Sequence, residues 1–570
     1  MNDTRDSSVA HGGGQLGNER ALRYAEPAAE AHRFQLTIRH LLARALLTAP
    51  DQRIVYRDHG SYTYRQFAER VTRLASTLAT LGAGHGTTVA IMDWDSHRYL
   101  ESYFAVPMMG AVLQTVNVRL PNAQIAYTLR HAGAEILLVH RDFFPLLAAI
   151  LPEVPRLRAV IIITDDPVDE LPSWATGEYE QLLGAARAGF DFEDLDENAI
   201  ATTFFTTGTT GRPKGVTFSH RQLVLHAITA NAPFGGSNAV PCLAPGDVYM
   251  PLTPMFHVHA WGVPYVATML GLKQVYPGRY ESALICRLRR EHGVTFSHGV
   301  PTILQMLLKA SETTGVSLEG WKMIIGGSAL TKALLLEARR RGMDVVSGYG
   351  MSETCPTISI AMHPAAGSVD ESVLAETLTA AGVPIPLVHA RIVNEAMEDV
   401  PHDGVTRGEL VLRAPWLTSG YTEDAVASES LWRGGWLHTQ DVATMDANGC
   451  IRIRDRLKDV IKSGGEWIDS LQLEDLLGSV EGVVEAVVIA VPDEHWGERP
   501  LAVIVAQPHA VMSLDVLNAP IERAIAAGAI TRYARLDRFE LVDEIPRTSV
   551  GKPDKKAVRA RFGTGSAVTI

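Results

Sequence analysis

Residues 201–220 read ATTFFTTGTTGRPKGVTFSH and form the most informative stretch of the chain. Apolar segments typical of strands flank a polar loop, so we predict a loop between two strands. Glycine N–H groups can approach an anion closely, threonine hydroxyls are short donors or metal ligands, and lysine adds a compact positive charge. The loop therefore predicts a polyphosphate site, with the candidate ligands Thr206, Thr207, Gly208, Thr209, Thr210, Gly211 and Lys214.

The loop differs from a P-loop of the Walker type. Lys214 is followed by Gly215 instead of Ser or Thr, and Pro213 opposes the helix that begins there in a P-loop NTPase. The pattern therefore disfavours a kinase or a GTPase. A flexible hairpin rich in Thr and Gly is the plain structural alternative, but it would not require this order of hydroxyls, glycines and lysine.

Outward from this loop, apolar segments of strand length alternate with segments of helical spacing. Expected strands include 135–140, 159–163, 322–327 and 344–350, and expected helices include 301–310 and 331–340. Such alternation predicts an α/β fold of layered subdomains with largely buried sheets.

The pattern changes twice towards the C-terminus. Beyond about Pro384, short strands such as 390–393 and 409–414 are separated by Gly, Pro and Asp turns, which predicts a small β-barrel or sheet. Helices near 469–480 and 514–527, with strands near 483–491, 500–506 and 538–543, then predict a small α+β unit. We expect three parts: an N-terminal extension at 1–33 whose composition favours disorder, a large domain at 34–455 and a small mobile domain at 456–570.

Composition and charge exclude several classes of protein. Hydrophobic residues make up 46% and charged residues 20% of the 570 residues, as in ordinary globular proteins. The formal net charge of −12 argues against binding to nucleic acid or to an anionic membrane. No apolar run approaches the roughly 18 residues that span a bilayer, and the N-terminus lacks a signal-type hydrophobic region. We expect a cytoplasmic protein without stable membrane anchoring.

A second motif, GYGMSETCP at 348–356, ends an expected strand. Ligands bind at the carboxyl edge of α/β sheets, so this position suits a binding site. The Tyr349 ring could stack on a base, while Ser352 and Glu353 offer oxygen atoms of the kind that Mg²⁺ prefers.

A third motif, PMFHVHAWGVPY at 254–265, crowds bulky side chains into an apolar segment. His257 and His259 could suggest a metal site, but no matching cluster of Cys, His or acidic residues is near them in the sequence, so zinc is rejected. The segment fits a pocket wall better. A plain core aromatic is the alternative role for Trp261.

Together these motifs resemble those of the adenylate-forming superfamily, which contains acyl-CoA synthetases, adenylation domains of peptide synthetases, and luciferases. The resemblance extends over about residues 34–560 and includes GGSAL at 326–330 and TQDVATMDANG at 439–449. It implies that Tyr349 lies against adenine, that Asp441 and Arg456 hold the ribose, and that Ser352 contacts phosphate. It also implies a nucleotide-binding role for Gly327, Gly348 and Gly350, and Mg²⁺ ligands at Glu353 and Thr206.

The resemblance also assigns roles to the acid site and to the C-terminal part. His257 would border the carboxylate of the acid, with Trp261 and Gly350 along the acyl tunnel. RLKDVIKSGGEWI at 456–468 would be the interdomain joint, with its hinge at Lys458. Lys462 would reach the nucleotide, and Ser463, Gly464, Gly465 and Trp467 would approach CoA. In PRTSVGK, Lys552 matches the mobile lysine that acts in adenylation. One position departs from the family pattern, because Gln440 stands where glycine usually precedes the aspartate.

The resemblance predicts a ligase for a small-molecule carboxylic acid, with ATP and CoA as co-substrates and Mg²⁺ as cofactor. The acid would attack the α-phosphorus of ATP, pyrophosphate would leave, and the CoA thiol would then displace AMP from the acyl-AMP. The chain resembles bacterial medium- to long-chain fatty acyl-CoA ligases in particular. A short methylthio-alkanoate or aryl acid, and an acyl-AMP ligase that loads a carrier protein, are alternatives. A luciferase and a non-catalytic nucleotide-binding regulator share the same fold. We also expect a homodimer.

Overall fold

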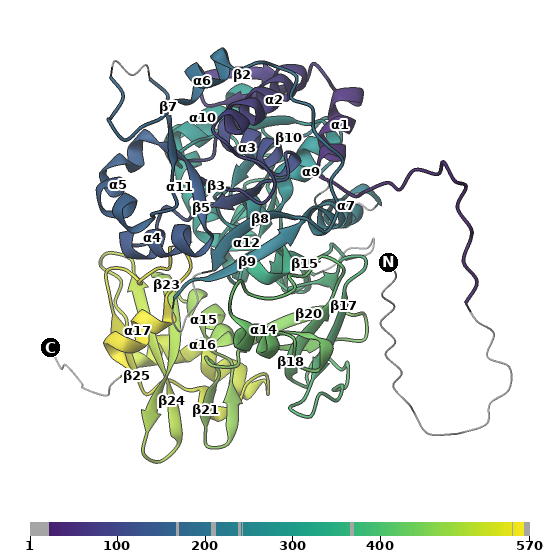
Figure 1. Cartoon of the computed structure of the whole chain (residues 1–570). Coiled ribbons are helices and arrows are strands. Elements are labelled where there is room, and N and C mark those ends of the chain that lie inside the picture. The colour runs from purple at the N-terminus through teal and green to yellow at the C-terminus, as the bar shows by residue number, and fades with distance from the viewer. Residues whose placement is uncertain are drawn as a thin grey trace, which may run out of the picture. The chain divides into compact units, whose positions relative to one another are not determined.

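The structure, a computed structural model, describes residues 22–166, 170–206, 212–236, 241, 243–364, 370–549 and 551–563. Residues from Leu36 onward belong to one compact unit. The residues from 22 to 35 contain no helix or strand. Figure 1 shows the arrangement of the elements described below.

Two large sheets form the centre of the N-terminal body. A seven-stranded sheet has the order β7-β6-β5-β3-β4-β8-β9 and is parallel except for the antiparallel pair β8 and β9. Residues 136–138 of β5 are fully buried, as expected for a parallel sheet covered on both faces. The strands are β3 (Thr88–Met92), β4 (Val112–Thr115), β5 (Ala134–His140), β6 (Ala159–Ile163), β7 (Gly177–Glu178), β8 (Ile200–Thr206) and β9 (Lys214–Ser219).

The second large sheet has nine strands in the order β16-β15-β14-β13-β12-β10-β11-β1-β2. It is parallel from β1 to β14 and antiparallel at both ends. Its strands are β1 (Arg53–Tyr56), β2 (Gly60–Thr63), β10 (Val248–Leu252), β11 (Lys273–Tyr276), β12 (Phe296–Gly299), β13 (Lys322–Ile325), β14 (Asp344–Gly350), β15 (Thr357–Ile360) and β16 (Val383–Pro384).

Several helices of the body begin at capping residues that the sequence marks, as Thr63 does for α2 and Ser96 for α3. In α2, Thr63 and Gln66 form a capping box, and the face that carries Phe67, Val71 and Leu74 is buried. The helices include α1 (Arg39–Thr48), α2 (Tyr64–Thr80), α3 (His97–Met108), α4 (Asn122–His131), α5 (Phe144–Ile150), α6 (Tyr179–Ala185), α7 (His220–Gly236), α8 (Val258–Trp261), α9 (Val263–Leu270), α10 (Ser282–His292), α11 (Pro301–Thr314), α12 (Lys332–Arg340), α13 (Glu371–Leu378) and α14 (Ala425–Leu431). The predicted α/β architecture is confirmed.

The predicted small β-barrel is not confirmed. The strands β17 (His389–Val393), β18 (Gly408–Arg413), β19 (Leu437–Met445) and β20 (Ile451–Arg456) form an antiparallel sheet, and within the described residues its outer strands β17 and β20 do not pair with each other. The free edge of β20 is instead bonded to the neighbouring body: Ile451 donates to the carbonyl of Gly382 at 2.8 Å and accepts from its N–H at 3.1 Å. At Ile451 the backbone groups that could pair with β17 are therefore already used.

This bridge places the four-stranded sheet beside the nine-stranded one. Gly382 directly precedes β16, which pairs with β15, and β15 pairs with β14. The strands β19 and β20 are therefore held near the end of β14, where the GYG motif lies.

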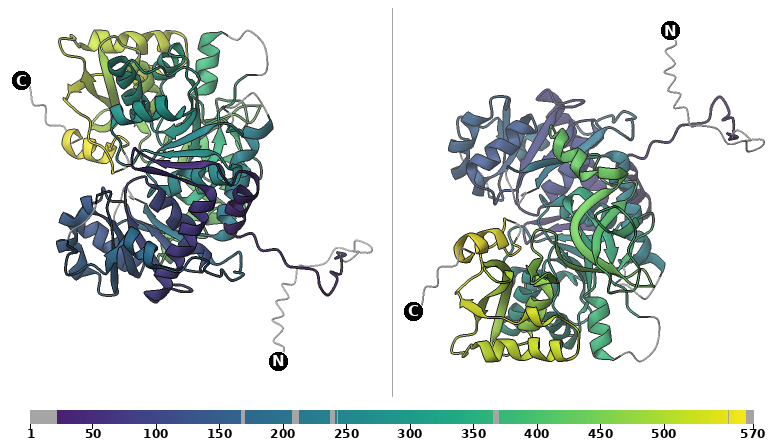
Figure 2. Two further views of the ribbon diagram at one scale, coloured as in Figure 1. Left: turned by 90° about the horizontal axis from the view of Figure 1, so that it is seen from above. Right: turned by 90° about the horizontal axis from the view of Figure 1, so that it is seen from below.

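The C-terminal domain has its own sheet and its own apolar clusters. Its sheet has the order β22-β21-β24-β23, with β25 paired to β24, and its buried apolar side chains form clusters separate from the main core. The elements are β21 (Ile461–Ser463), β22 (Glu466–Ile468), α15 (Ser470–Gly478), β23 (Val483–Asp493), β24 (Gly497–Ala506), α16 (Leu514–Ala526), β25 (Arg538–Leu541) and α17 (Lys555–Phe562). These elements stay together in both views of Figure 2.

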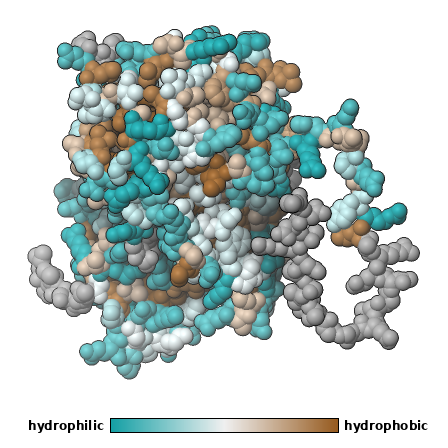
Figure 3. All heavy atoms as spheres, in the orientation of Figure 1, coloured by the Kyte–Doolittle hydropathy of each residue, from teal (hydrophilic) through white to brown (hydrophobic). Residues whose placement is uncertain are grey.

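On the face drawn in Figure 3, the N-terminal body and the C-terminal hairpins differ in hydropathy. Hydrophobic residues gather over the upper body, and hydrophilic residues predominate over the hairpins at the lower edge. None of the helices in the described ranges is long and apolar enough to cross a lipid bilayer.

Replacing Gly382 with alanine should destabilise the protein strongly. Gly382 has φ +84°, and a Cβ atom there would lie 2.1 Å from the carbonyl carbon of Ile360. We expect the free energy of unfolding to fall by about 3 kcal/mol or more, because of backbone strain and overpacking. Gly293→Ala is the matched control. Gly293 has φ +68°, but no described atom beyond its chain neighbours lies within 4 Å of the position of its Cβ, so the free energy of unfolding of this variant should fall by only about 1 kcal/mol. Thermal unfolding of the two variants measures the difference, and equal midpoints would contradict the role of this bridge.

Candidate active site

The hairpin of β8 and β9 carries the two ends of the predicted phosphate loop. Thr206 and Lys214 stand opposite each other in the ladder, which confirms that the loop joins two strands. The Lys214 ammonium lies 4.6 Å from the centroid of the Tyr421 ring, within the range of a cation–π contact. The predicted ligands Thr207, Gly208, Thr209, Thr210 and Gly211 lie outside the described residues.

Tyr421 connects this hairpin to Glu353. Its hydroxyl donates a hydrogen bond of 2.7 Å to Glu353 Oε1, and the next residue, Thr422, donates from its N–H to the Gly215 carbonyl at 2.9 Å. Sequence reasoning missed Tyr421, which lies in the loop between β18 and α14. The usable signal was an aromatic hydroxyl in a Ser-Gly-Tyr-Thr loop, because functional groups concentrate in such loops.

Glu353 is 7% exposed and lies in a short 3-10 turn that begins at Ser352. Burial raises the pKa of its carboxyl above the usual value, while the Tyr421 hydroxyl, Arg456 and Lys214 oppose that rise. The carboxylate therefore lies within a set of positive and hydrogen-bonding groups.

The GYG motif meets the four-stranded sheet through hydrogen bonds. The Tyr349 hydroxyl, at the end of β14, donates to Asp441 Oδ2 at 2.6 Å, and Arg456 Nε lies 3.3 Å from Asp441 Oδ1. Asp441 and Arg456 are partners in the ladder between β19 and β20. Burial raises the pKa of Asp441, and Arg456 opposes this shift. The structure thus brings three predicted nucleotide-binding residues together.

Gln440 occupies a backbone conformation that favours glycine. Its φ is +60°, in the left-handed region, and its carbonyl accepts a hydrogen bond of 2.9 Å from Leu457. This geometry explains why glycine suits the position before the aspartate. The Gln440 departure leaves Asp441 in contact with Arg456.

At two of the predicted glycines, neighbouring atoms lie where a side chain would begin. A Cβ atom at Gly350 would lie 1.8 Å from the Pro356 carbonyl oxygen. Gly327 has φ +81°, and a Cβ atom there would lie 3.2 Å from Lys552 Cε. A side chain at residue 327 would thus obstruct the Lys552 side chain. Gly348 lies in β14 before Tyr349.

Lys552 comes from the C-terminal domain and enters this same site. Burial and the nearby charge of Arg456 lower its pKa to about 8, while Asp441 and Glu353 oppose the decrease. The segment that carries it is held against the body, since Asn117 Nδ2 donates to Ser549 Oγ at 2.9 Å. Lys552 therefore approaches the body from a different domain.

The acid-site motif forms a left-handed turn. Residues 258–261 have φ between +47° and +60°, and all are buried. His257 directly precedes the turn, and burial together with the charges of Lys552 and Arg119 lowers its pKa to about 3, so its imidazole is neutral. The Trp261 ring lies 5.1 Å from the His298 ring, centroid to centroid. The turn therefore places His257 near Lys552 and Trp261 against the strand ends.

The predicted CoA residues lie in a hairpin of the C-terminal domain, and the predicted hinge residue Lys458 lies just before that hairpin. Lys462 lies 5.4 Å over the Trp467 ring within its own hairpin, and its N–H donates to Glu498 at 2.7 Å. Ser463 accepts from Arg499, while Gly464 and Gly465 form the left-handed hairpin turn. Lys458 lies in the exposed link between β20 and β21. Among the described residues, no hydrogen bond or ion pair joins the hairpin residues Lys462, Ser463, Gly464, Gly465 and Trp467 to Glu353 or Asp441. Lys458 lies closer: partial burial lowers its pKa, and the charges of Arg456 and Asp441 act on it in opposite directions.

Comparison with known proteins places this geometry in a family. Residues 42–422 match the AMP-binding enzyme family, and residues 472–552 match the C-terminal domain of AMP-binding enzymes. The chain belongs to the AMP-binding enzyme family. The predicted membership of the adenylate-forming superfamily is therefore confirmed.

Several relatives of this AMP-binding enzyme are named as CoA ligases. A long-chain-fatty-acid–CoA ligase of Thermus thermophilus is 39% identical over 93% of this chain and 96% of its own length. A 3-methylmercaptopropionyl-CoA ligase of Ruegeria pomeroyi is 36% identical over 87% and 90%. A medium-chain-fatty-acid–CoA ligase of Ectopseudomonas oleovorans is 34% identical over 88% and 90%.

The fold of this AMP-binding enzyme also matches solved structures. The anthranilate CoA ligase AuaEII, crystallised with anthranoyl-AMP, has a TM-score of 0.80 and 22% sequence identity, covering 93% of this chain and 97% of its own. At this identity the likeness concerns the fold alone.

The Tyr421 hydroxyl should tune the ionisation of Glu353. In Tyr421→Phe the carboxylate loses a donor at 2.7 Å, so the pKa of Glu353, already raised by burial, should rise further. An activity that needs the ionised carboxylate should then be lost at a higher pH as the solution is acidified. The acid limb of kcat/KM for acid-dependent pyrophosphate release measures this shift. An unmoved limb would show that the hydroxyl does not act on Glu353.

Proposed function

We propose that this chain is an ATP-dependent carboxylic acid–CoA ligase that activates a medium- or long-chain fatty acid as acyl-AMP, releasing pyrophosphate and then AMP. The enzyme class predicted from the sequence, an AMP-forming acyl-CoA synthetase, is confirmed by the family and by relatives named as CoA ligases. Its substrates therefore include ATP and CoA. The observation that carries the mechanism is the approach of Lys552 to the cluster of Asp441, Arg456 and Glu353.

The nucleotide is proposed to bind between β14 and the four-stranded sheet. Asp441 and Arg456 would hold the ribose hydroxyls, and Tyr349 would present its ring to adenine while its hydroxyl fixes Asp441. Gly350 leaves room for the Pro356 carbonyl and Gly327 for the Lys552 side chain, and both would border the bound nucleotide. Ser352, Lys214 and the loop from Thr206 to Gly211 would contact the phosphates.

The oxygen ligands at this site fit Mg²⁺. Glu353 supplies a buried carboxylate, and Thr206 supplies a hydroxyl across the ladder from Lys214, which contacts Tyr421 beside Glu353. Hard cations prefer such oxygen atoms together with substrate phosphates. When bound, Mg²⁺ would neutralise charge on the phosphates.

Adenylation needs positioning and charge neutralisation, with no covalent protein nucleophile. The acid carboxylate would attack the α-phosphorus in line, and the Lys552 and Lys214 ammonium groups would offset the negative charge of the reacting groups. His257 is neutral and lies near Lys552, so it can border the carboxylate of the acid while Lys552 alone supplies the positive charge. The bond from the α-phosphorus to the bridging oxygen breaks, and pyrophosphate leaves with the electron pair.

Thioester formation requires a second arrangement of the domains. Lys462, Ser463, Gly464, Gly465 and Trp467 lie away from the cluster, so we propose that residues 456–570 rotate about Lys458 relative to residues 34–455. The rotation would withdraw Lys552 and bring the hairpin towards the acyl-AMP, where the CoA thiol attacks.

The names of the relatives bear on the identity of the acid. Relatives named for long- and medium-chain fatty acids favour an alkyl chain, and a relative named for 3-methylmercaptopropionate supports the shorter alternative. Trp261, His257 and Gly350 would line the acid site. An aryl acid and transfer to a carrier protein are further alternatives. The homodimer and the cytoplasmic location stay predictions.

A screen for acid-dependent pyrophosphate release tests the function. Straight-chain acids of graded length, with aryl and methylthio acids included, are supplied with ATP, and CoA is added or withheld. We expect the highest kcat/KM for medium- or long-chain acids and acyl-CoA formation without any carrier protein. Preference for a methylthio or aryl acid would overturn the assignment of the acid, and dependence on a carrier would overturn the assignment of CoA.

Lys552 should act in adenylation alone. Lys552→Ala should lower acid-dependent pyrophosphate release by at least about 100-fold while sparing thioester formation from supplied acyl-AMP. Because its pKa is lowered to about 8, the ammonium loses its proton as the pH rises through that value, so kcat/KM of the wild type should decline above about pH 8. Exposed Lys556, altered to Ala, is the control. Equal loss of both half-reactions in Lys552→Ala would contradict this division of labour.

A further inference from the structure

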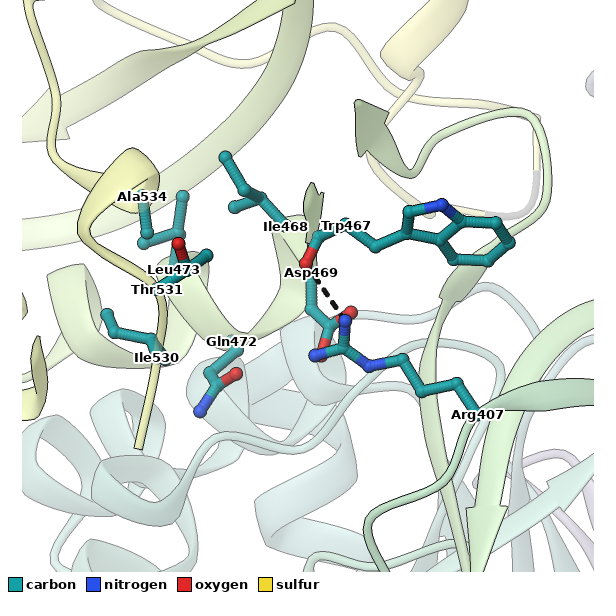
Figure 4. A pocket seen from close by; sticks show the side chains of 9 residues that line it. All are labelled: Arg407, Trp467, Ile468, Asp469, Gln472, Leu473, Ile530, Thr531 and Ala534. Atoms are coloured by element: carbon teal, nitrogen blue, oxygen red, sulfur yellow. Dashed lines mark hydrogen bonds and ion pairs between the residues drawn. The ribbon is translucent and has the colours of Figure 1, made fainter. Parts of the chain in front are cut away.

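A small cavity lies at the joint between the four-stranded sheet and the C-terminal domain (Figure 4). Arg407 reaches it from the segment before β18, and Trp467, Asp469 and Thr531 reach it from the C-terminal domain. Its volume of about 20 Å³ is far below the roughly 300 Å³ of the smallest ligand pockets. The cavity is therefore a joint between domains and not a substrate site.

The side chain of Arg407 crosses this joint. Its NH2 lies 2.8 Å from Asp469 Oδ2, and its NH1 donates to the Trp467 carbonyl at 2.9 Å. The Asp469 side chain is 1% exposed, and its Oδ1 has no hydrogen-bond partner among the described residues. Burial raises the pKa of Asp469 to about 6, and Arg407 and Arg454 oppose this rise. A carboxylate buried to this degree depends on its cationic partner.

Ser470, the residue after Asp469, is also bonded to the large domain. Asp455, next to Arg456 on β20, accepts a hydrogen bond of 2.7 Å from the Ser470 N–H. The Ser470 hydroxyl in turn accepts from Lys555 Nζ at 2.5 Å, and Lys555 also pairs with Glu474 at 2.7 Å. Lys555 begins α17, three residues after Lys552. A continuous set of polar contacts thus leads from β20 to the segment that carries Lys552.

We propose that Arg407 and Asp455 are positioning residues that grip Asp469 and Ser470 and so hold Lys552 in its adenylation position. The name joint clasp is used for these four residues. In each contact, one residue precedes Lys458 in the chain and belongs to the large domain, and the other follows Lys458 and belongs to the small domain. A rotation of the small domain about Lys458 therefore separates the two residues of each contact. The joint clasp therefore favours adenylation and opens before the thioester step. This inference rests on the proposed function.

The two half-reactions test the joint clasp. Arg407→Met should lower acid-dependent exchange of pyrophosphate into ATP by at least about fivefold, as expected for the loss of a coupling contact. Thioester formation from supplied acyl-AMP should be unchanged or faster, and Arg407→Lys should restore part of the exchange. Arg391→Met is the matched control, since Arg391 on β17 pairs at 2.6 Å with Asp399, which lies between β17 and β18 in the same domain. An equal fall in both half-reactions would indicate a structural role and overturn the proposal.

A double variant tests the pair itself. If Arg407 acts through Asp469, Arg407→Met combined with Asp469→Asn should lower exchange no further than the more damaging single variant. Independent, multiplying effects would overturn the pairing.

Hydrogen exchange tests the joint clasp without relying on catalysis. In the ligand-free protein, peptides that cover residues 546–556 should take up deuterium faster in Arg407→Met than in Arg391→Met, because the contact between Asn117 and Ser549 opens more often. Unchanged uptake would overturn the joint clasp even if the proposed acid were wrong. Absence of acid-dependent exchange in the wild type, with the expected uptake, would overturn the proposed function alone.

Discussion

The pairing of Asp441 with Arg456 across β19 and β20 is the interaction on which the rest of the site depends. The Tyr349 hydroxyl joins this pair to the end of β14, and Lys552 approaches it from the C-terminal domain. A buried carboxylate is costly unless it is paired and hydrogen-bonded, so each partner that reaches Asp441 also stabilises it. Three parts of the chain that are distant in sequence therefore converge on one charged group.

The convergence has an electrostatic consequence for the C-terminal domain. Burial and the charge of Arg456 lower the pKa of Lys552 to about 8, and the negative charges of Asp441 and Glu353 offset only part of this decrease. A polyphosphate bound at the proposed site would add negative charge and favour the ammonium form, so nucleotide binding and placement of the lysine would be coupled.

The sequence predicted the order of the elements well, because the strands and helices show clear hydrophobic periodicity. The expected strands at 135–140 and 344–350 and the expected helix at 301–310 match β5, β14 and α11. The barrel was not confirmed. Closure would require β20 to pair with β17, but β20 bridges to Gly382, and no hydrophobic periodicity around Gly382 marks it as that partner. Glu353, Asp441 and Lys552 were predicted as site residues from motifs, and the structure places them near one another. The contacts of Tyr421 with Glu353 and of Arg407 with Asp469 join residues that are distant in sequence, and a single sequence does not reveal such contacts.

The left-handed turn at residues 258–261 holds the proposed wall of the acid site in one conformation. A non-glycine residue in this conformation costs about 1–2 kcal/mol, and four such residues stand in succession. The surrounding core must compensate, since all four residues are buried. The segment proposed as the wall of the acid site is thus shaped before any ligand binds. Exchanging one of its residues for that of a relative would alter the backbone strain of the whole turn, so the specificity of the proposed wall would belong to the segment as a unit.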